Sequence, residues 1–252
     1  INGDTYTDVI LQGPDGLRFI PGAQNGFLAN VNFDQLPKIN GTILGDGNVQ
    51  AVGMFDGKPL LMASRADGTV ALIQDDAGVC ASLPADSALI KVSSLFTHEN
   101  RVGVGTRLSD VGNTTLNGRV RLYDVNPAGQ NVTLNTTYEG DAGARLGAAA
   151  LSFVGADGKP ILVLGATGER NLTGAIHIIS QEGGPQVLHG ELSAGLFGST
   201  VAVAGNQFLV TAQSAGVVYK FDIGEGSFPS NLTQAIKYSG TPQSFGISLA
   251  GS

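Results

Sequence analysis

The side chains in this sequence best suited to proton transfer are three histidines, His98, His177 and His189. An imidazole beside a carboxylate can act as a general acid or base, and Glu99 directly follows His98. Adjacent residues of a strand point to opposite faces, so this pair is not expected to share a site unless a turn falls there. His177 lies in an alternating strand pattern and is interpreted as a strand residue, and His189 as a solvated residue of an outer strand.

Other patterns that carry catalysis are missing from the sequence. It contains no Gly-x-Ser-x-Gly motif, no phosphate-binding loop and no paired cysteines. Cys80 is the only cysteine, so it cannot form a disulfide within the chain and is interpreted as a small buried residue. From these observations we expect that the chain is not an enzyme.

Recognition by loops is the more plausible chemistry, because loops held on a rigid scaffold commonly carry function. The longest loops between expected strands cover residues 106–117 and 166–173. Their best candidates for polar contacts with a partner are Arg107, Asp110, Glu169 and Arg170.

Six Asn-x-Ser/Thr triplets are candidate N-glycosylation sites, more than the composition predicts by chance. We therefore expect a secreted or cell-surface glycoprotein; alternatively, Asn and Thr simply populate turns and strands. The six asparagines are Asn40, Asn113, Asn131, Asn135, Asn171 and Asn231.

The charge of the chain narrows the choice of partners. The net charge is −7 and the calculated pI is about 4.8, which disfavours nucleic acid and anionic lipid surfaces. No apolar run approaches the roughly 20 residues of a spanning helix, so we expect no membrane insertion by this segment. Because the chain begins at Ile1 rather than Met, it is expected to be a processed product or a fragment.

The elements that would hold these loops recur along the chain. A glycine followed by a short alternating strand appears every 42 to 56 residues, and a more apolar strand precedes each one. A first strand rich in small residues and a polar outer strand complete the repeat. The glycine-led strands are 16–20, 68–73, 118–123, 174–179 and 216–221; the apolar strands are 8–13, 59–63, 101–105, 160–165 and 208–212.

Four antiparallel strands in about fifty residues match one blade of a β-propeller. We therefore predict an all-β fold and a single domain over residues 1–252, with five four-stranded blades. The first blade would be closed by both ends of the chain; alternatively, the chain is part of a six- or seven-bladed ring. The predicted blades cover 1–45 with 243–252, 46–88, 89–141, 142–193 and 194–242.

Several of these segments resemble the FG-GAP repeats of integrin α subunits, in which Phe-Gly-x-Ser-Val-Ala precedes an apolar strand ending in Gly-Ala-Pro and then Gly-Ala-Val-Tyr-Val-Phe. The resemblance is good over residues 145–252, fair over 101–144 and weaker over 23–100. Members of the family usually have seven blades, and their loops between second and third strands meet partners. The matching segments are 164–167, 174–179, 197–202 and 216–221.

The resemblance also implies a possible calcium site near the start of the chain. In the family, an Asp-rich loop between the first and second strands often holds this ion, and residues 1–9 resemble the later part of that motif. Asn2, Asp4 and Asp8 would supply side-chain oxygens and Tyr6 a backbone carbonyl, as a hard cation prefers. The leading Asp of the motif has no counterpart before Ile1, and Thr5 replaces a glycine; otherwise Asp4 and Asp8 cap a turn.

Three functions follow as hypotheses. The first is an extracellular adhesion or assembly module that presents loops on a rigid disc to protein partners at the cell surface. The second is a lectin that binds glycans, although the absence of Trp disfavours stacking on sugars. The third is the propeller portion of a larger secreted hydrolase or lyase.

Overall fold

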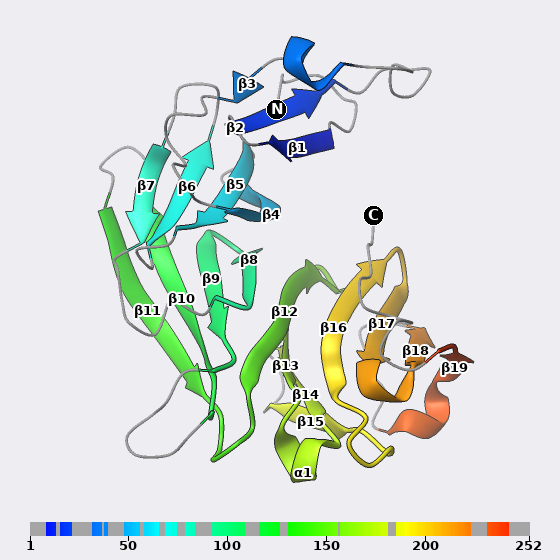
Figure 1. The fold of residues 1–252 in the computed structure, drawn as a ribbon. Coiled ribbons are helices and arrows are strands. Elements are labelled where there is room, and N and C mark those ends of the chain that lie inside the picture. The colour runs from blue at the N-terminus through cyan, green and yellow to red at the C-terminus, as the bar shows by residue number, and fades with distance from the viewer. Residues whose placement is uncertain are drawn as a thin grey trace. The chain divides into compact units, whose positions relative to one another are not determined.

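The computed structural model describes the chain in segments that are built almost entirely of β-strands (Figure 1). None of the helices in these segments has the length and hydropathy of a membrane crossing. The chain divides into two compact units, residues 1–90 with 125–132, and residues 91–124 with 133–252. The described residues are 9–13, 16–21, 32–36, 38–39, 48–55, 58–65, 69–74, 79–83, 92–108, 116–126, 131–155, 157–180, 185–222 and 231–241.

The first unit contains a three-stranded and a four-stranded sheet, each with neighbouring strands in chain order. The side chains of residues 60–63 in β5 and 70–73 in β6 are buried almost completely, as expected for the central strands of a packed sheet. The strands are β1 (Val9–Gly13), β2 (Gly16–Ile20), β3 (Lys38–Ile39), β4 (Asn48–Phe55), β5 (Lys58–Ser64), β6 (Val70–Gln74) and β7 (Val79–Leu83), and a 3-10 turn, η1, covers Phe33–Gln35.

The second unit holds two four-stranded sheets and most of a third, again with strands in chain order. The sheets are β8 (Ser94–His98), β9 (Arg101–Thr106), β10 (Arg119–Asn126) and β11 (Asn131–Glu139); β12 (Leu146–Val154), β13 (Pro160–Ala166), β14 (Ala175–Ser180) and β15 (Gln186–His189); and β16 (Phe197–Ala204), β17 (Gln207–Ala212), β18 (Val217–Asp222) and β19 (Ile236–Ser239). One short helix, α1 (Glu169–Leu172), and the 3-10 turns η3 (Gln213–Ala215) and η4 (Leu232–Gln234) lie between strands.

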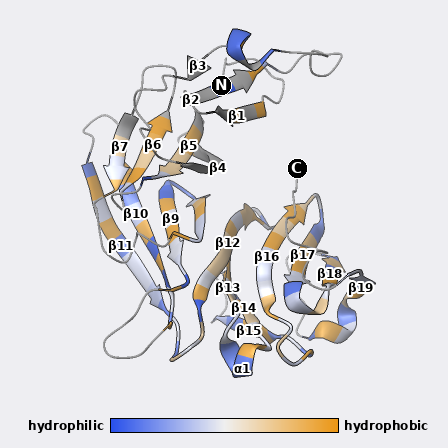
Figure 2. Ribbon diagram, in the orientation of Figure 1, coloured by the Kyte–Doolittle hydropathy of each residue, from blue (hydrophilic) through white to orange (hydrophobic). Residues whose placement is uncertain are grey.

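The repeat in the sequence becomes four-stranded antiparallel sheets, which confirms the all-β prediction at this level. The second strand of each sheet in the second unit is mostly buried, whereas the outer strand β11 is largely exposed. Figure 2 colours the strands by hydropathy and shows hydrophilic residues on α1. The number of blades stays a prediction, and the proposed closing strand at residues 243–252 lies outside the described residues.

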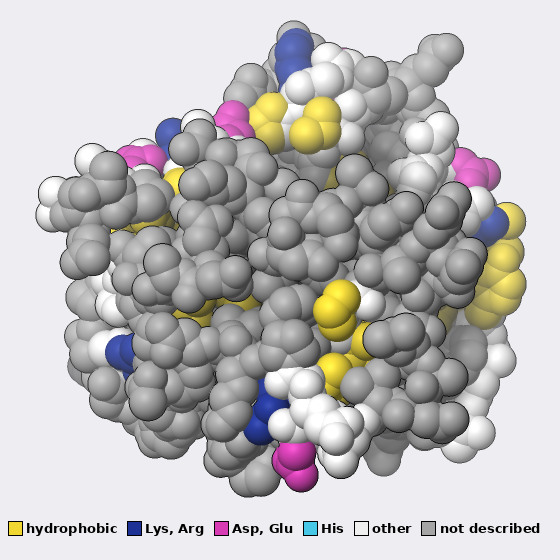
Figure 3. Space-filling view, turned by 90° about the horizontal axis from the view of Figure 1, so that it is seen from above, with side chains coloured by type: hydrophobic (Ala, Val, Ile, Leu, Met, Phe, Trp, Pro, Cys, Tyr) yellow, Lys and Arg dark blue, Asp and Glu magenta, His cyan; other side chains and the backbone are white. Residues whose placement is uncertain are grey.

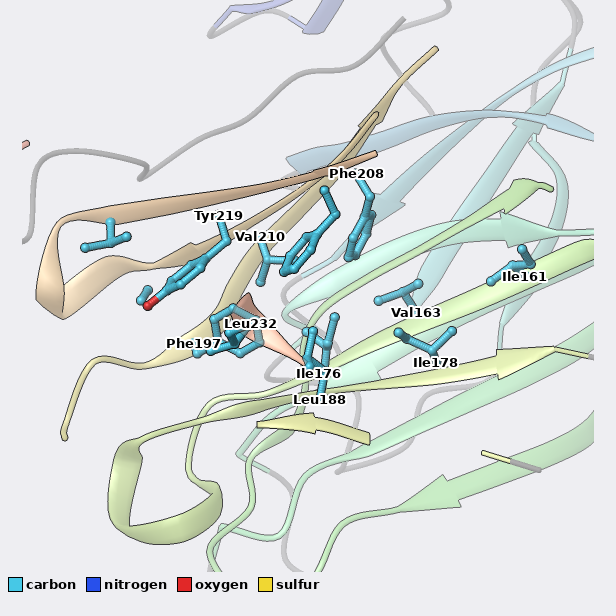
Figure 4. Close-up of a cluster of buried hydrophobic side chains, with 13 residues drawn as sticks. Ile161, Val163, Ile176, Ile178, Leu188, Phe197, Phe208, Val210, Tyr219 and Leu232 are labelled. Atoms are coloured by element: carbon cyan, nitrogen blue, oxygen red, sulfur yellow. The ribbon is translucent and has the colours of Figure 1, made fainter. Parts of the chain in front are cut away.

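A large hydrophobic cluster joins the sheets β12–β15 and β16–β19 (Figure 4). Ile176 and Ile178 of β14 contribute to it, as alternate residues on one face of the strand. Phe197 packs edge-on against Tyr219, with ring centroids 5.1 Å apart. Ala175, on the other face of β14, joins a second cluster with residues of β8, β10 and β12. The side chains of β14 therefore pack on both faces.

Backbone atoms make a repeated junction between successive sheets of the second unit. The residue before each third strand forms a parallel bridge with the first residue of the next sheet, joining Gly118 to Leu146 and Gly174 to Phe197. At the second junction, the Phe197 amide donates to the Thr173 carbonyl at 3.0 Å, and the Gly190 amide donates to Gly174 at 2.8 Å. Backbone hydrogen bonds therefore join successive sheets, in addition to the packing of their hydrophobic side chains.

Charged side chains of both signs reach the surface among the described residues, as the face in Figure 3 shows. Some form exposed ion pairs. Arg101 pairs with Glu99 at 2.9 Å and with Asp124 at 3.0 Å, and such pairs contribute little stability in water.

Candidate functional site

The connection between β13 and β14 has an unusual backbone. Arg170, Asn171 and Leu172 have φ angles of 47°, 56° and 68°, in the left-handed region that residues with a Cβ rarely occupy. Three such residues in succession cost free energy and persist only where the surroundings fix them. Here the Gly168 amide donates to Ala144 at 2.8 Å, and the Leu196 amide donates to Leu172 at 2.9 Å.

This strained turn holds Glu169 against two histidines of the neighbouring strands. In the register of β14 and β15, Ala175 pairs with His189 and His177 pairs with Val187, which places both histidines on one face of the sheet. His177 Nε2 hydrogen-bonds Glu169 Oε1. His189 Nδ1 lies 3.7 Å from Glu169 Oε2, within ion-pair range but beyond a good hydrogen bond.

The surroundings of His189 lower the pKa of its imidazole. Burial lowers its pKa from the ordinary value, and the positive charge of Arg170 lowers it further, while Glu169 acts in the opposite direction. Its Nδ1 atom is buried and has no hydrogen-bond partner among the described residues. A neutral imidazole can accept a proton at one ring nitrogen or donate one from the other. The carboxylate of Glu169, whose side chain is only 17% exposed, orients the imidazole of His177.

Glu169 and His189 open into a recess of about 580 Å³, here called the Glu169 recess. Its wall offers carboxylate, guanidinium, amide and imidazole groups, and the loop 141–144 closes one side. The lining residues are Asp141, Ala142, Gly143, Ala144, Gly168, Glu169, Arg170, Asn171, Leu172 and His189. The arrangement can bind a polar group through several hydrogen bonds, or exchange a proton with it.

The structure separates the predicted contact residues. Glu169 and Arg170 line this recess, whereas Arg107 is exposed after β9 and lines a different pocket. Asp110 lies outside the described residues. So do Asn2, Asp4, Tyr6 and Asp8, and calcium binding there stays a prediction. Within the described ranges, no group of three or more His, Cys, Asp or Glu residues is placed to hold a metal ion.

Four of the six predicted glycosylation sites can be located. Asn131, Asn135, Asn171 and Asn231 are all exposed, while Asn40 and Asn113 lie outside the described residues. The Asn135 amide donates to Asp124 at 2.7 Å, and Asn171 forms part of the wall of the Glu169 recess.

Sequence reasoning missed the roles of His177 and His189. The period of two along β14 already places His177 on the face opposite Ile176 and Ile178, but its contact with Glu169 depends on the strained turn. Glu99 lies in a turn and contacts Arg101, while His98 Nδ1 lies 2.7 Å from Ser152 Oγ.

No protein-family model and no curated protein matches the chain, but solved structures do. Kluyveromyces lactis Hsv2 is similar over 86% of this chain and 57% of its own, with 14% identity and a TM-score of 0.50. A second structure of that protein, with complete loop 6CD, gives 13% identity, coverages of 87% and 57%, and a TM-score of 0.51. A catalytically inactive histidine-to-alanine variant of virginiamycin B lyase from Staphylococcus aureus, with quinupristin, is similar over 98% of this chain and 70% of its own. The identity is 11% and the TM-score is 0.54.

These neighbours are β-propellers, and at this identity they show the fold alone. The chain has a β-propeller fold. It spans 57% of the length of Hsv2. The expectation that the chain is not an enzyme is corrected by this comparison, because a structural neighbour, virginiamycin B lyase, is an enzyme. The lack of familiar motifs therefore does not set this fold apart from catalysis.

Proposed function

We propose that the protein is an extracellular binding module that recognises a polar partner in the Glu169 recess. The observation that carries the proposal is the strained, hydrogen-bonded turn at Arg170–Leu172, which fixes charged and polar side chains around a preformed hollow. Groups held in place before binding lose little conformational entropy when the partner arrives. Backbone strain of this kind clusters at functional sites.

The lining of the recess favours recognition by charge and hydrogen bonds. Asp141 and Glu169 accept hydrogen bonds, and Arg170 donates them, while no Phe, Tyr or Trp is among the described residues that line the wall. This suits a charged segment of a partner protein better than a sugar that stacks on an aromatic platform. A glycan held through its hydroxyl groups is the alternative occupant, and the experiment below separates the two.

The exposed sequons support an extracellular location. Asn131, Asn135 and Asn231 are not among the residues that line the recess. Asn171 belongs to that lining, so a glycan there would occupy the recess. The proposal therefore requires Asn171 to be unmodified in the active protein, which glycopeptide mass spectrometry measures directly.

Acid–base catalysis is a second candidate function, favoured by the imidazoles that contact Glu169. The hydrogen bond between His177 and Glu169 orients one ring, and the other ring, that of His189, has a lowered pKa and lines the recess. A bound substrate would meet a proton donor or acceptor there. In virginiamycin B lyase, too, replacing one histidine by alanine abolishes catalysis. This reading agrees with the chain being the propeller portion of a secreted hydrolase or lyase.

The test is a binding screen of the purified chain against an array of extracellular protein domains and a glycan array. Glu169→Gln should weaken the selected interaction about tenfold, the effect of losing one hydrogen bond to a charged group. Glu99→Gln is the matched control, because it makes the same change in an exposed turn outside the recess. Equal affinities of both variants and the parent would refute the proposal.

The same ligands, analysed by mass spectrometry after incubation, separate binding from catalysis. Turnover that His189→Gln abolishes while binding persists would favour the second candidate. An unchanged ligand, with affinity that depends on Glu169, supports the binding module.

A further inference from the structure

A second hollow in the same unit is lined by two arginines, Arg107 and Arg145. This pocket of about 220 Å³, here called the arginine pocket, lies where β9, β12, β13 and β16 begin or end. It is distinct from the Glu169 recess, with which it shares no lining residue. The lining residues are Arg107, Leu108, Arg145, Ala148, Thr167, Leu196, Ser199 and Gln213.

Both arginines of the pocket lack a carboxylate partner among the described residues. Arg101, in contrast, is paired with Glu99 and Asp124. The backbone amide of Arg107 donates to Ser93 Oγ at 3.1 Å, which fixes the start of its loop. Two cations that share one pocket repel each other, and an anion between them relieves that repulsion.

Neutral polar groups complete the wall. Thr167, which is only 6% exposed, lines the pocket next to the arginines. The Ser199 hydroxyl donates to the Leu196 carbonyl, and Ser199 and Gln213 also line the pocket.

The backbone holds this set in place. Arg145 and Leu196 have φ angles of 56° and 57°, again in the left-handed region. The Arg145 amide donates to Leu116 at 3.0 Å, and the Leu196 amide to Leu172 at 2.9 Å. The strained position of Arg145, which lines the pocket, is thus stabilised by the junction between sheets.

From these observations we infer that the arginine pocket binds an oxyanion, namely a carboxylate, sulfate or phosphate group. A guanidinium presents parallel N–H groups that match two oxygens of such an anion. The Thr167 hydroxyl and the Gln213 amide add donors. A wider hollow of about 350 Å³ shares Arg107, Leu108 and Ala148 with the pocket, and it gives room for the molecule that carries the anion.

Isothermal titration with sodium phosphate, sodium sulfate and sodium acetate, each at constant ionic strength set with chloride, tests the inference. We expect saturable binding of at least one of these anions to one site per chain. Arg107→Gln and Arg145→Gln should each weaken binding at least about tenfold, because each removes one charge-assisted contact. A preference for phosphate and sulfate over acetate identifies a tetrahedral anion, and the reverse identifies a carboxylate.

Two further variants keep the outcome unambiguous. Arg101→Gln removes an arginine outside the pocket and should leave binding unchanged, whereas Thr167→Val preserves the shape and should weaken it several-fold. Binding of none of the three anions, or an equal loss with Arg101→Gln and Arg145→Gln, would overturn the inference. Because the Glu169 recess shares no residue with this pocket, failure here leaves the proposed binding function intact.

Discussion

The junction between sheets predicts how much a single methyl group would cost at Gly174. This residue has a φ angle of +86°, and a Cβ built on it would lie 2.2 Å from the Phe197 carbonyl oxygen and 2.5 Å from the Phe197 nitrogen. Both are backbone atoms of the next sheet, so they cannot move aside as the end of a flexible side chain would. Gly174→Ala must therefore separate the two strands that the bridge joins.

Two effects add up in this variant. A residue with a Cβ in the left-handed region costs about 1–2 kcal/mol. Displacing a packed neighbour typically costs a further 1–3 kcal/mol. We expect Gly174→Ala to lower the free energy of unfolding by about 2–5 kcal/mol, a large part of the roughly 5–15 kcal/mol of a typical domain.

Gly143→Ala isolates the first effect. Its φ angle of +79° is similar, yet no atom lies within 4 Å of the added Cβ. Only the conformational cost remains, about 1–2 kcal/mol. Gly165→Ala isolates the cost of displacing a packed neighbour. Its Cβ would lie 2.1 Å from the Gly198 carbonyl oxygen, while its φ angle is outside the left-handed region.

Urea denaturation followed by tyrosine fluorescence suits this chain, which has five Tyr and no Trp. The expected order of unfolding free energies is parent, then Gly143→Ala, then Gly174→Ala. If Gly143→Ala and Gly174→Ala are destabilised equally, the contact with Phe197 contributes nothing and the reasoning about the junction is refuted. Failure of Gly174→Ala to fold, with Gly143→Ala folded, agrees with the prediction.

Three further variants test other parts of the second unit. Asn231→Ala removes the oxygen that accepts a hydrogen bond from the Thr233 amide at 3.1 Å. The loss of this cap should lower the free energy of unfolding by about 1 kcal/mol in the same urea titration, and an unchanged midpoint would contradict this. Leu162→Ala empties a fully buried position and should cost about 2–5 kcal/mol, so a loss below 1 kcal/mol would show that the core collapses around it. Burial lowers the pKa of both His98 and His189 below 6.5, so the unfolded chain takes up protons more readily than the folded one, and stability should fall as the pH drops below about 6.5. Replacing both histidines by Gln should flatten this dependence between pH 7 and pH 5 in urea titrations, and an unchanged slope argues against their role.

The strands were predictable because their signals are local. The apolar run at residues 160–165 becomes β13 (Pro160–Ala166), and the alternating run that begins at Gly174 becomes β14 (Ala175–Ser180). Burial on both faces, or on alternate residues, leaves a pattern in the sequence itself. The number of sheets in a ring leaves no such local signal, since it depends on how the sheets assemble.

The candidate sites were only partly predictable. Glu169 and Arg107 were singled out because they lie in long polar loops, but nothing in the sequence marks Arg170 and Leu172 as left-handed. That turn decides which residues Glu169 contacts. The approach of Arg107 to Arg145 likewise depends on the register between neighbouring sheets, so the arginine pocket could not be read from spacing.

The junction described above has a consequence for how such molecules are recognised. Its bridges and hydrogen bonds join peptide groups, so apart from the glycines that allow the close approach, many side chains fit the same connection. Two chains can therefore preserve it with few residues in common, in keeping with fold similarity at 11–14% identity. Pattern searches for this architecture should weigh the interval between glycines above the identity of the apolar residues.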